Sequence, residues 1–106
     1  MKTLILFALL FSTQLFAREL PSQLTMTLKS FSTQTNAKDS FAQLMKQAKE
    51  DDPKKKGILI LFKAKKNKDI NLNLSQMPII EIIRYMCISS DYSFKVIGRT
   101  VIISDK

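Results

Sequence analysis

The apolar positions between residues 69 and 91 change their period once. From residue 69 to 75 they alternate with polar residues, which is the period of a strand with one buried face. Behind Pro78 they recur at helical spacing through Cys87, and proline is tolerated at a first helical position. This pattern predicts a strand followed by an amphipathic helix. We expect Cys87 to be a small buried hydrophobe rather than a reactive thiol.

Two strand-like runs follow this helix, at residues 92–97 and 100–104. They are rich in aromatic and β-branched residues, as strands are. Gly98 and Arg99 lie between them and predict a tight turn. The C-terminal part of the chain therefore reads as strand, helix and hairpin.

A similar succession occurs earlier in the chain. Alternating apolar residues from Leu24 to Phe31 predict a first strand, and the polar segment 32–35 predicts a loop. Asn36 is a favourable helix N-cap, with Asp39 three residues later as in a capping box. The apolar spacing that follows predicts an amphipathic helix that ends before Pro53.

Residues 58–62 form an apolar run that is too short for most helices. We expect a central strand that is covered on both faces. The full order then becomes β-α-β-β-α-β-β, an α+β domain with two helices packed against small mixed or antiparallel sheets. Strand, polar turn and amphipathic helix occur twice in this order, which indicates a faint internal repeat.

Residues 1–17 have the features of a secretory signal peptide. Lys2 supplies the positive charge, residues 4–11 form a short apolar segment, and Ala17 offers a small residue for cleavage. The apolar segment is shorter than the ~20 residues of a bilayer-spanning helix, which favours a cleaved signal over a membrane anchor. We expect a flexible N-terminus over residues 18–23, a domain over residues 24–106, and a location in the periplasm or cell envelope.

The composition excludes most catalytic chemistry. The chain has no histidine, one cysteine and two glycines, so imidazole catalysis, thiolate zinc sites and phosphate-binding glycine loops are excluded. Its one acidic cluster, residues 50–52, precedes three lysines and is interpreted as a solvated helix end. We therefore expect no enzyme activity, no catalytic or metal-binding residue and no cofactor.

The excess of positive charge is the one unusual feature of the composition. Lysine and arginine total 17 against 9 acidic residues, a formal net charge of +8. Seven lysines near the apolar run are candidate anion-binding residues for anionic lipid, polysaccharide or an acidic partner, with a plain lysine-rich rim as the alternative: Lys54, Lys55, Lys56, Lys63, Lys65, Lys66 and Lys68. Nucleic acid is not an expected partner, because aromatic and arginine residues are not interleaved with these lysines.

The C-terminal segment resembles the secretin and TonB N-terminus short domain, a periplasmic module. The matching segments are Ile70-x-Leu72-x-Leu74, Gln76–Ile79, Glu81–Arg84, Tyr92-x-Phe94-x-Val96 and Gly98–Ile103. Family members usually carry a small residue where this chain has Ile82, and glycine at the helix exit where it has Asp91. Aspartate tolerates the left-handed conformation of such an exit moderately well, so we expect the turn to be kept.

The resemblance implies an exported, non-enzymatic protein-binding module. In secretins and TonB-dependent receptors this domain precedes a membrane barrel; here the chain stops at Lys106, so we expect a free-standing version. The implied partner is an envelope protein, such as an outer-membrane secretin or a TonB-system component.

Addition of a partner strand at an exposed sheet edge is a plausible physical mode of binding. The candidate partner-binding residues for this mode are Asn71, Asn73 and Ser75, on the polar face of the strand at 69–75. Two alternatives stay open. One is a basic envelope protein that binds polysaccharide or associates weakly with an anionic membrane surface, and the other is a small enzyme.

Overall fold

The computed structural model describes residues 20–106, so the predicted signal peptide at residues 1–17 lies outside the described residues. In chain order the elements are α2 (Ser22–Thr25), β1 (Thr27–Asn36), α3 (Ala37–Asp51), β2 (Leu59–Phe62), β3 (Asp69–Pro78), α4 (Ile79–Ser90), β4 (Tyr92–Ile97) and β5 (Thr100–Asp105). After α2 the order is β-α-β-β-α-β-β. The fold is α+β, as predicted.

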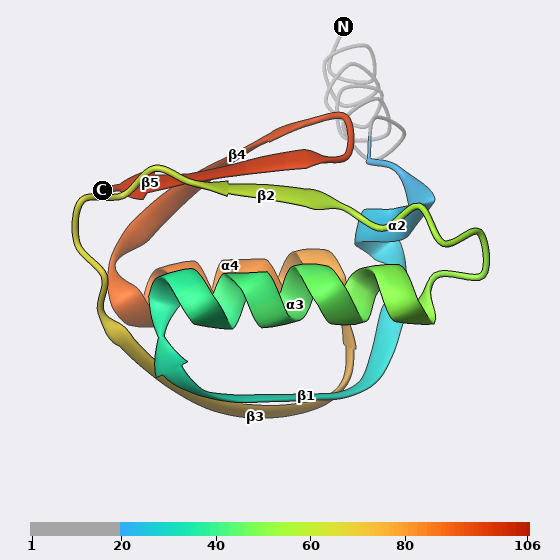
Figure 1. The fold of residues 1–106 in the computed structure, drawn as a ribbon, viewed down its shortest axis with the longest axis horizontal. Helices are drawn as coiled ribbons and strands as arrows, with labels where there is room; N and C mark the ends of the chain where they lie inside the picture. The colour runs from blue at the N-terminus through green and yellow to red at the C-terminus, as the bar shows by residue number, and fades with distance from the viewer. Residues whose placement is uncertain (1–19) are drawn as a thin grey trace, which may run out of the picture.

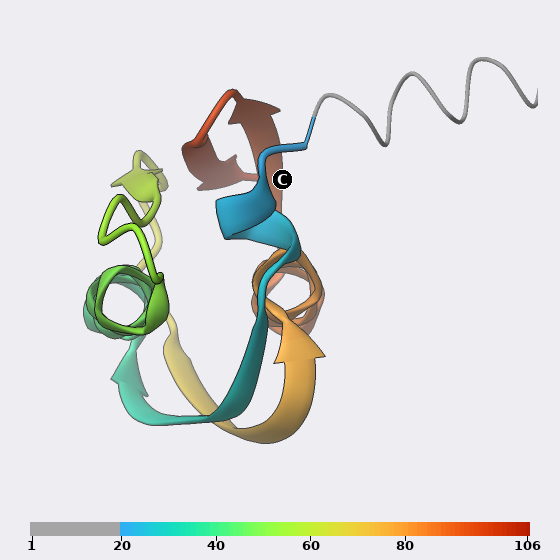
Figure 2. The same cartoon turned by 90° about the vertical axis from the view of Figure 1, so that its right-hand side faces the viewer.

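The two long helices lie between two small sheets (Figure 1). On one side, β1 and β3 pair antiparallel as a two-stranded ribbon. On the other side, the strand order is β2-β5-β4, with β2 parallel and β4 antiparallel to β5. Figure 2 shows α3 and α4 end-on, side by side, with the ribbon curving beneath both of them. The predicted mixture of parallel and antiparallel pairing is thus confirmed.

The core fills the space between the helices and both sheets. The predicted apolar stripe of α4 is fully or almost fully buried: Ile79, Ile80, Ile82, Ile83, Met86 and Cys87. α3 contributes a narrower set: Ala37, Phe41, Leu44 and Ala48. Burial raises the pKa of the Cys87 thiol to about 12, so the thiol stays protonated and unreactive at neutral pH, as expected.

Two of the helix ends that sequence reasoning singled out are built as predicted, but Pro78 is the last residue of β3 and the N-cap of α4 rather than its first helical residue. The side chain of Asn36 accepts a hydrogen bond from the Asp39 N–H at 2.9 Å, which caps α3. α4 ends at Asp91, whose φ of 62° lies in the left-handed region that glycine usually occupies. Aspartate therefore replaces glycine at this exit without loss of the turn.

The first strand begins later and ends later than predicted. Residues 22–25 form the short helix α2, capped by Pro21, and place Leu24 in the core. Gln23, within the segment expected to be flexible, is also buried. The predicted loop at residues 32–35 is wrong, because these residues continue β1 and pair with residues 70–73 of β3. Polar residues form this strand since the partner strand satisfies their backbone groups.

The expectation of a central strand at residues 58–62 is also wrong. β2 lies at an edge of its sheet, and Leu59 and Leu61 keep 48% and 37% of their surface exposed. The centre is β5, where Val101 and Ile103 are fully buried. Both long helices lie on one face of this sheet (Figure 1), so the alternate residues of β2 that point to the other face, Leu59 and Leu61, stay exposed.

The connection from α3 to β2 corrects part of a third expectation, that residues 50–52 are a solvated helix end: Glu50 and Asp51 are exposed as predicted, but Asp52 is not. Asp52 is buried, and its carboxylate accepts hydrogen bonds at 3.0 Å from the N–H groups of Lys54, Lys56 and Gly57. The bond from Gly57, followed by that from Lys54, lowers the pKa of Asp52, and the Gln23 side chain contributes a further bond. This turn fixes where β2 starts relative to α3.

Candidate functional site

The outer edge of β2 is a row of backbone groups with no partner strand. The N–H of Leu59 donates to the Arg99 carbonyl at 2.9 Å and that of Lys63 to the Ile103 carbonyl at 2.7 Å, so the odd-numbered residues bond to β5. Because backbone groups alternate in direction along a strand, the N–H groups of Ile60 and Phe62 point away from β5. These groups form the free edge.

The free edge of β2 has one weak contact across to α3. The Ile60 N–H donates to the Met45 sulfur at 3.3 Å. A thioether is a weak acceptor, so the Ile60 donor is poorly satisfied compared with a donor inside a ladder. Met45 is half-buried, and its unbranched side chain can move aside at low cost. The free edge is therefore covered by the flexible Met45 side chain and not by the backbone of another strand.

A groove runs between α3 and β2 along this edge. We call it the α3–β2 groove. It consists of two hollows that share Ala42 and Met45, one of about 620 Å³ at the start of β2 and one of about 350 Å³ at its end. The apolar part of the lining comes from Phe41, Ala42 and Met45 on α3 and from Ile58, Leu59, Ile60, Leu61 and Phe62. An extended segment lying beside β2 would contact this apolar surface.

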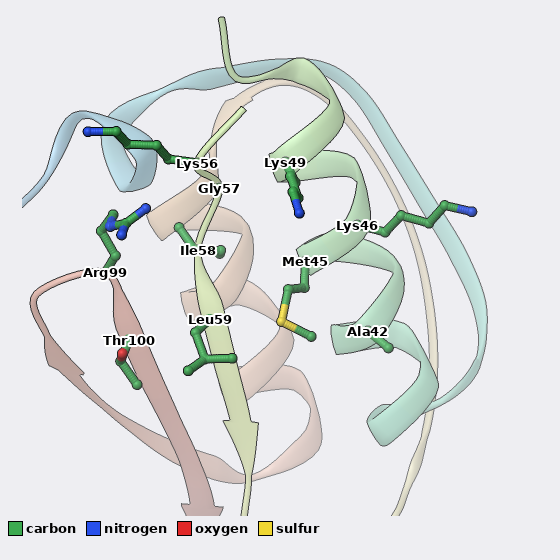
Figure 3. Close-up of a pocket in the computed structure, with 10 residues that line it drawn as sticks. All are labelled: Ala42, Met45, Lys46, Lys49, Lys56, Gly57, Ile58, Leu59, Arg99 and Thr100. Carbon is green, nitrogen blue, oxygen red and sulfur yellow. The ribbon is translucent and has the colours of Figure 1, made fainter. Parts of the chain in front are cut away.

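Basic residues border the groove at both ends. At the start of β2 these are Lys46, Lys49, Lys56 and Arg99, and at its end Lys38 and Lys63. In Figure 3, Lys49 lies on the side of α3 that faces β2. Lys56 and Arg99 lie on the other side of β2, and the Lys56 side chain extends away from α3. The Lys46 side chain extends away from β2 in the same view. Within residues 20–106, no acidic residue lines either hollow.

The seven candidate anion-binding lysines do not form one surface. Residues 54–56 lie in the turn before β2 and residues 63–68 follow its end, so a strand of roughly 13 Å separates the two groups. Of the seven, Lys56 borders the first hollow and Lys63 the second. Arg99, Lys38 and the two lysines that border the first hollow from α3, Lys46 and Lys49, were missed by sequence reasoning. For the two lysines, the helical spacing from Ala42 is a usable signal, since i, i+4 and i+7 share one helix face.

The group at residues 63–68 is held by its backbone rather than by its ammonium groups. The Asp105 carboxylate accepts from the N–H groups of Lys65 at 2.7 Å and Lys66 at 3.3 Å. The bond from Lys65 contributes most to lowering the pKa of Asp105. The Tyr92 hydroxyl donates to the Lys66 carbonyl at 2.8 Å and accepts from the Lys68 N–H at 2.9 Å. The loop is therefore ordered, with its lysine side chains exposed.

Asn71, Asn73 and Ser75 lie together on the exposed face of β3. Asn73 is opposite Ser32, whose hydroxyl donates to the Asn73 side-chain oxygen at 2.9 Å. The Ala37 N–H donates to the Lys68 carbonyl, and this bond sets the alternation of the ladder. By that alternation Asn73 occupies a non-hydrogen-bonded pair, so its N–H points away from β1. The ribbon thus has a second free edge.

Three further findings apply to residues 20–106. No cluster of three or more His, Cys, Asp or Glu residues could hold a metal ion there. Every buried side-chain nitrogen or oxygen in this part of the chain has a hydrogen-bond partner. No helix in the described range has the length and apolarity to cross a membrane.

Comparison with known proteins found no matching family model, no matching curated protein and no matching solved structure. The resemblance noted from the sequence accordingly stays a prediction.

Proposed function

We propose that this protein is an exported, non-enzymatic binding module that docks an envelope protein by adding a partner strand to the free edge of β2. The observation that carries this proposal is the pairing of that edge with the α3–β2 groove. Backbone groups supply hydrogen bonds, and the neighbouring apolar surface supplies burial, which are the two components of strand-addition binding. The Ile60 N–H, now bonded to sulfur at 3.3 Å, would gain a carbonyl acceptor.

The edge of β3, one of three other strand edges in the described residues beside those of β1 and β4, is a competing place for a partner strand. Asn71, Asn73 and Ser75 offer outward backbone groups and polar side chains there. The ribbon, however, curves around both helices (Figures 1 and 2), and strong curvature disfavours pairing with a straight segment. The β2 edge also has exposed Leu59 and Leu61 beside it, so binding there buries more apolar surface.

Export and the relation to the secretin and TonB N-terminus short domain belong to the same proposal. The family relation is supported by the order β-α-β-β-α-β-β, with the resembling segments in β3, α4, β4 and β5, and export is supported by the sequence pattern of residues 1–17. N-terminal sequencing of protein recovered from an envelope fraction should begin near Arg18. Recovery of an intact Met1 in a membrane pellet would show an anchor instead.

A crosslinking pull-down from the envelope fraction would identify the partner, and amide hydrogen exchange would then locate its docking edge. Strand addition at β2 should slow exchange of the Ile60 and Phe62 amides selectively, because these two point outward. Slowing at Asn71, Asn73 and Ser75 would place the partner on β3.

Asn73→Pro provides the matching variant for the β3 edge. The side chain is exposed and the N–H points outward, so proline removes an edge donor without emptying the core. This variant should stay folded and bind at full strength if the partner uses β2. Loss of binding in a folded Asn73→Pro protein would contradict docking at β2.

Binding of an anionic surface is the second candidate function. The observation that favours it is the set of six basic residues around the groove. Vesicles containing phosphatidylglycerol should then bind the protein with a steep salt dependence, whereas exchange at Ile60 and Phe62 should stay unchanged.

A further inference from the structure

We infer that the α3–β2 groove selects an extended acidic segment of a partner protein, with its carboxylates at the start of β2. This inference rests on the proposed function, since it names the chemistry of the strand that would be added there. It commits to a protein segment. Lipid and a second copy of this chain become outcomes to be tested.

The distribution of charge around the groove is the first argument. Lys49 comes from α3, Lys56 from the turn before β2, and Arg99 from the turn between β4 and β5. Three separate segments thus bring positive charge to the first residues of one edge strand (Figure 3). Within residues 20–106, no acidic residue lines the groove. A carboxylate of a partner would therefore be attracted to these cations without competition from an acidic residue of the groove itself.

Two acids of this region are engaged in backbone hydrogen bonds. Two others, Glu50 and Asp51 at the end of α3, line a separate hollow with Lys46 and not the groove itself. Asp52 accepts from three backbone N–H groups of its own turn. Asp105 accepts from the backbone of the loop at the far end of β2. In the described residues the one side-chain salt bridge joins Arg84 to Glu81 on α4, away from the groove. The cations at the start of β2 are therefore free to bind an external carboxylate.

The shape of the site argues for an extended segment. The apolar lining follows β2 from Ile58 to Phe62, and basic residues stand at both ends of that line. A strand of four or five residues would span it, since each residue advances about 3.3 Å. Acidic residues at the end nearest Gly57 would then meet the positive charge of Lys49 on the α3 side and of Lys56 across β2, while the backbone pairs with Ile60 and Phe62.

A second copy of this chain fits the groove poorly. Edge-to-edge pairing of two β2 strands would bring two sets of the same six basic residues together. Like charges placed across an interface oppose association. The chain itself carries a net charge of +8, so charge favours a partner of opposite sign.

Titration of the ¹⁵N-labelled protein with two synthetic octapeptides tests the inference. One peptide alternates glutamate with valine and threonine, and the other has glutamine in place of every glutamate. The acidic peptide should bind about tenfold more tightly at low salt, shift the Ile60 and Phe62 amides, and lose most of this advantage at high salt.

Two double variants with equal charge change locate the effect. Lys49→Gln with Lys56→Gln removes cations from the start of the groove, and Lys65→Gln with Lys66→Gln removes them from the opposite loop. All four side chains are exposed, so both proteins should fold. The groove variant should lose affinity for the acidic peptide by about tenfold, and the loop variant by less than about twofold.

The possible results separate this inference from the proposed function. Equal binding of both peptides with shifts at Ile60 and Phe62 overturns the acidic preference and keeps strand addition. Binding of the acidic peptide without those shifts overturns strand addition as well. Equal losses in the two double variants, or binding to phosphatidylglycerol vesicles but to neither peptide, also overturns the inference.

Discussion

The two long helices of this domain occupy similar places but have different environments. α4 lies between the ribbon and the side of the sheet formed by β4 and β5, and six apolar residues of its stripe are buried. α3 lies beneath β2, the edge strand, and keeps Ala42, Lys46 and Lys49 exposed. The strand–helix pattern thus occurs twice, but α4 is packed into the core whereas α3 forms one wall of the α3–β2 groove.

The physical cause of this difference is the number of strands above each helix. β5 and β4 lie over α4, whereas β2 is the one strand of this sheet that lies over α3 (Figure 2). The outer side of α3 therefore stays open, and its residues are free to be polar and charged. Because α4 is buried and the outer side of α3 is exposed, substitutions in the two helices should change the free energy of unfolding by different amounts.

The largest effect is expected in α4. Ile83 is fully buried, so Ile83→Ala should lower the free energy of unfolding by about 2–4 kcal/mol. Lys46→Ala, on the exposed side of α3, should change it by about 0.5 kcal/mol or less. Denaturant unfolding of both variants measures the contrast. Similar losses in the two proteins would contradict the assignment of core and groove.

The next effect concerns the turn that sets the start of the groove. Gly57 has a φ of +65°, and an added Cβ would lie 2.9 Å from the Lys49 Cβ. Gly57→Ala should therefore cost about 1–3 kcal/mol, from backbone strain together with displacement of α3. Gly98 shares the positive φ but has open space around it, so Gly98→Ala should cost about 1 kcal/mol. A larger loss from the Gly98 variant, read from thermal or denaturant unfolding, would refute this ranking.

Acid should loosen the same turn. The pKa of Asp52 is lowered in the folded protein from its ordinary 3.8, chiefly by the Gly57 and Lys54 N–H groups. Its stabilising contribution is therefore complete above about pH 4 and is lost as the pH falls through the lower, folded value. Asp52→Asn should reduce stability at neutral pH and flatten the acid limb of a stability profile. Asp51 is exposed, so Asp51→Asn should have neither effect. An unchanged acid limb in both variants would contradict a stabilising role of the Asp52 carboxylate in this turn.

The smallest effect is expected on the outer surface of α4. Arg84 and Glu81 form a salt bridge of 3.0 Å, but both side chains are nearly half exposed. Arg84→Ala should change the free energy of unfolding by roughly 0.5 kcal/mol or less, since exposed pairs contribute little. A double-mutant cycle with Glu81→Ala measures the coupling directly. A coupling comparable to the Ile83 effect would overturn the view of this face as solvated.

Much of the fold follows from local patterns. The stripe of α4, the cap at Asn36 and the left-handed exit at Asp91 depend on neighbouring residues, so periodicity and backbone preference predict them. The position of β2 does not. A short apolar run is compatible with an edge or a centre, and the choice depends on parallel pairing with β5, some forty residues later.

The candidate site was harder to predict for the same reason. Lys49, Lys56 and Arg99 come from three segments, and their proximity exists only after the sheet has formed. The cluster of lysines seen in the sequence reflected closeness along the chain, and β2 separates its two groups in space. Asn71, Asn73 and Ser75 were placed correctly on an exposed face, because strict alternation along one strand is a local property.

The ribbon also constrains how the chain can reach its fold. Even the nearest pair of the ladder joins Asn36 to Asp69, so the first strand meets its partner only after α3 and β2 have been made. Such distant pairing requires closure of a long loop before any contact compensates the lost chain entropy, which slows folding. Neither strand–helix half can close its core alone. Since one core is shared by both halves, we expect the domain to fold as a single cooperative unit, and a chain cut between β2 and β3 to leave two fragments with exposed apolar surface rather than two small domains.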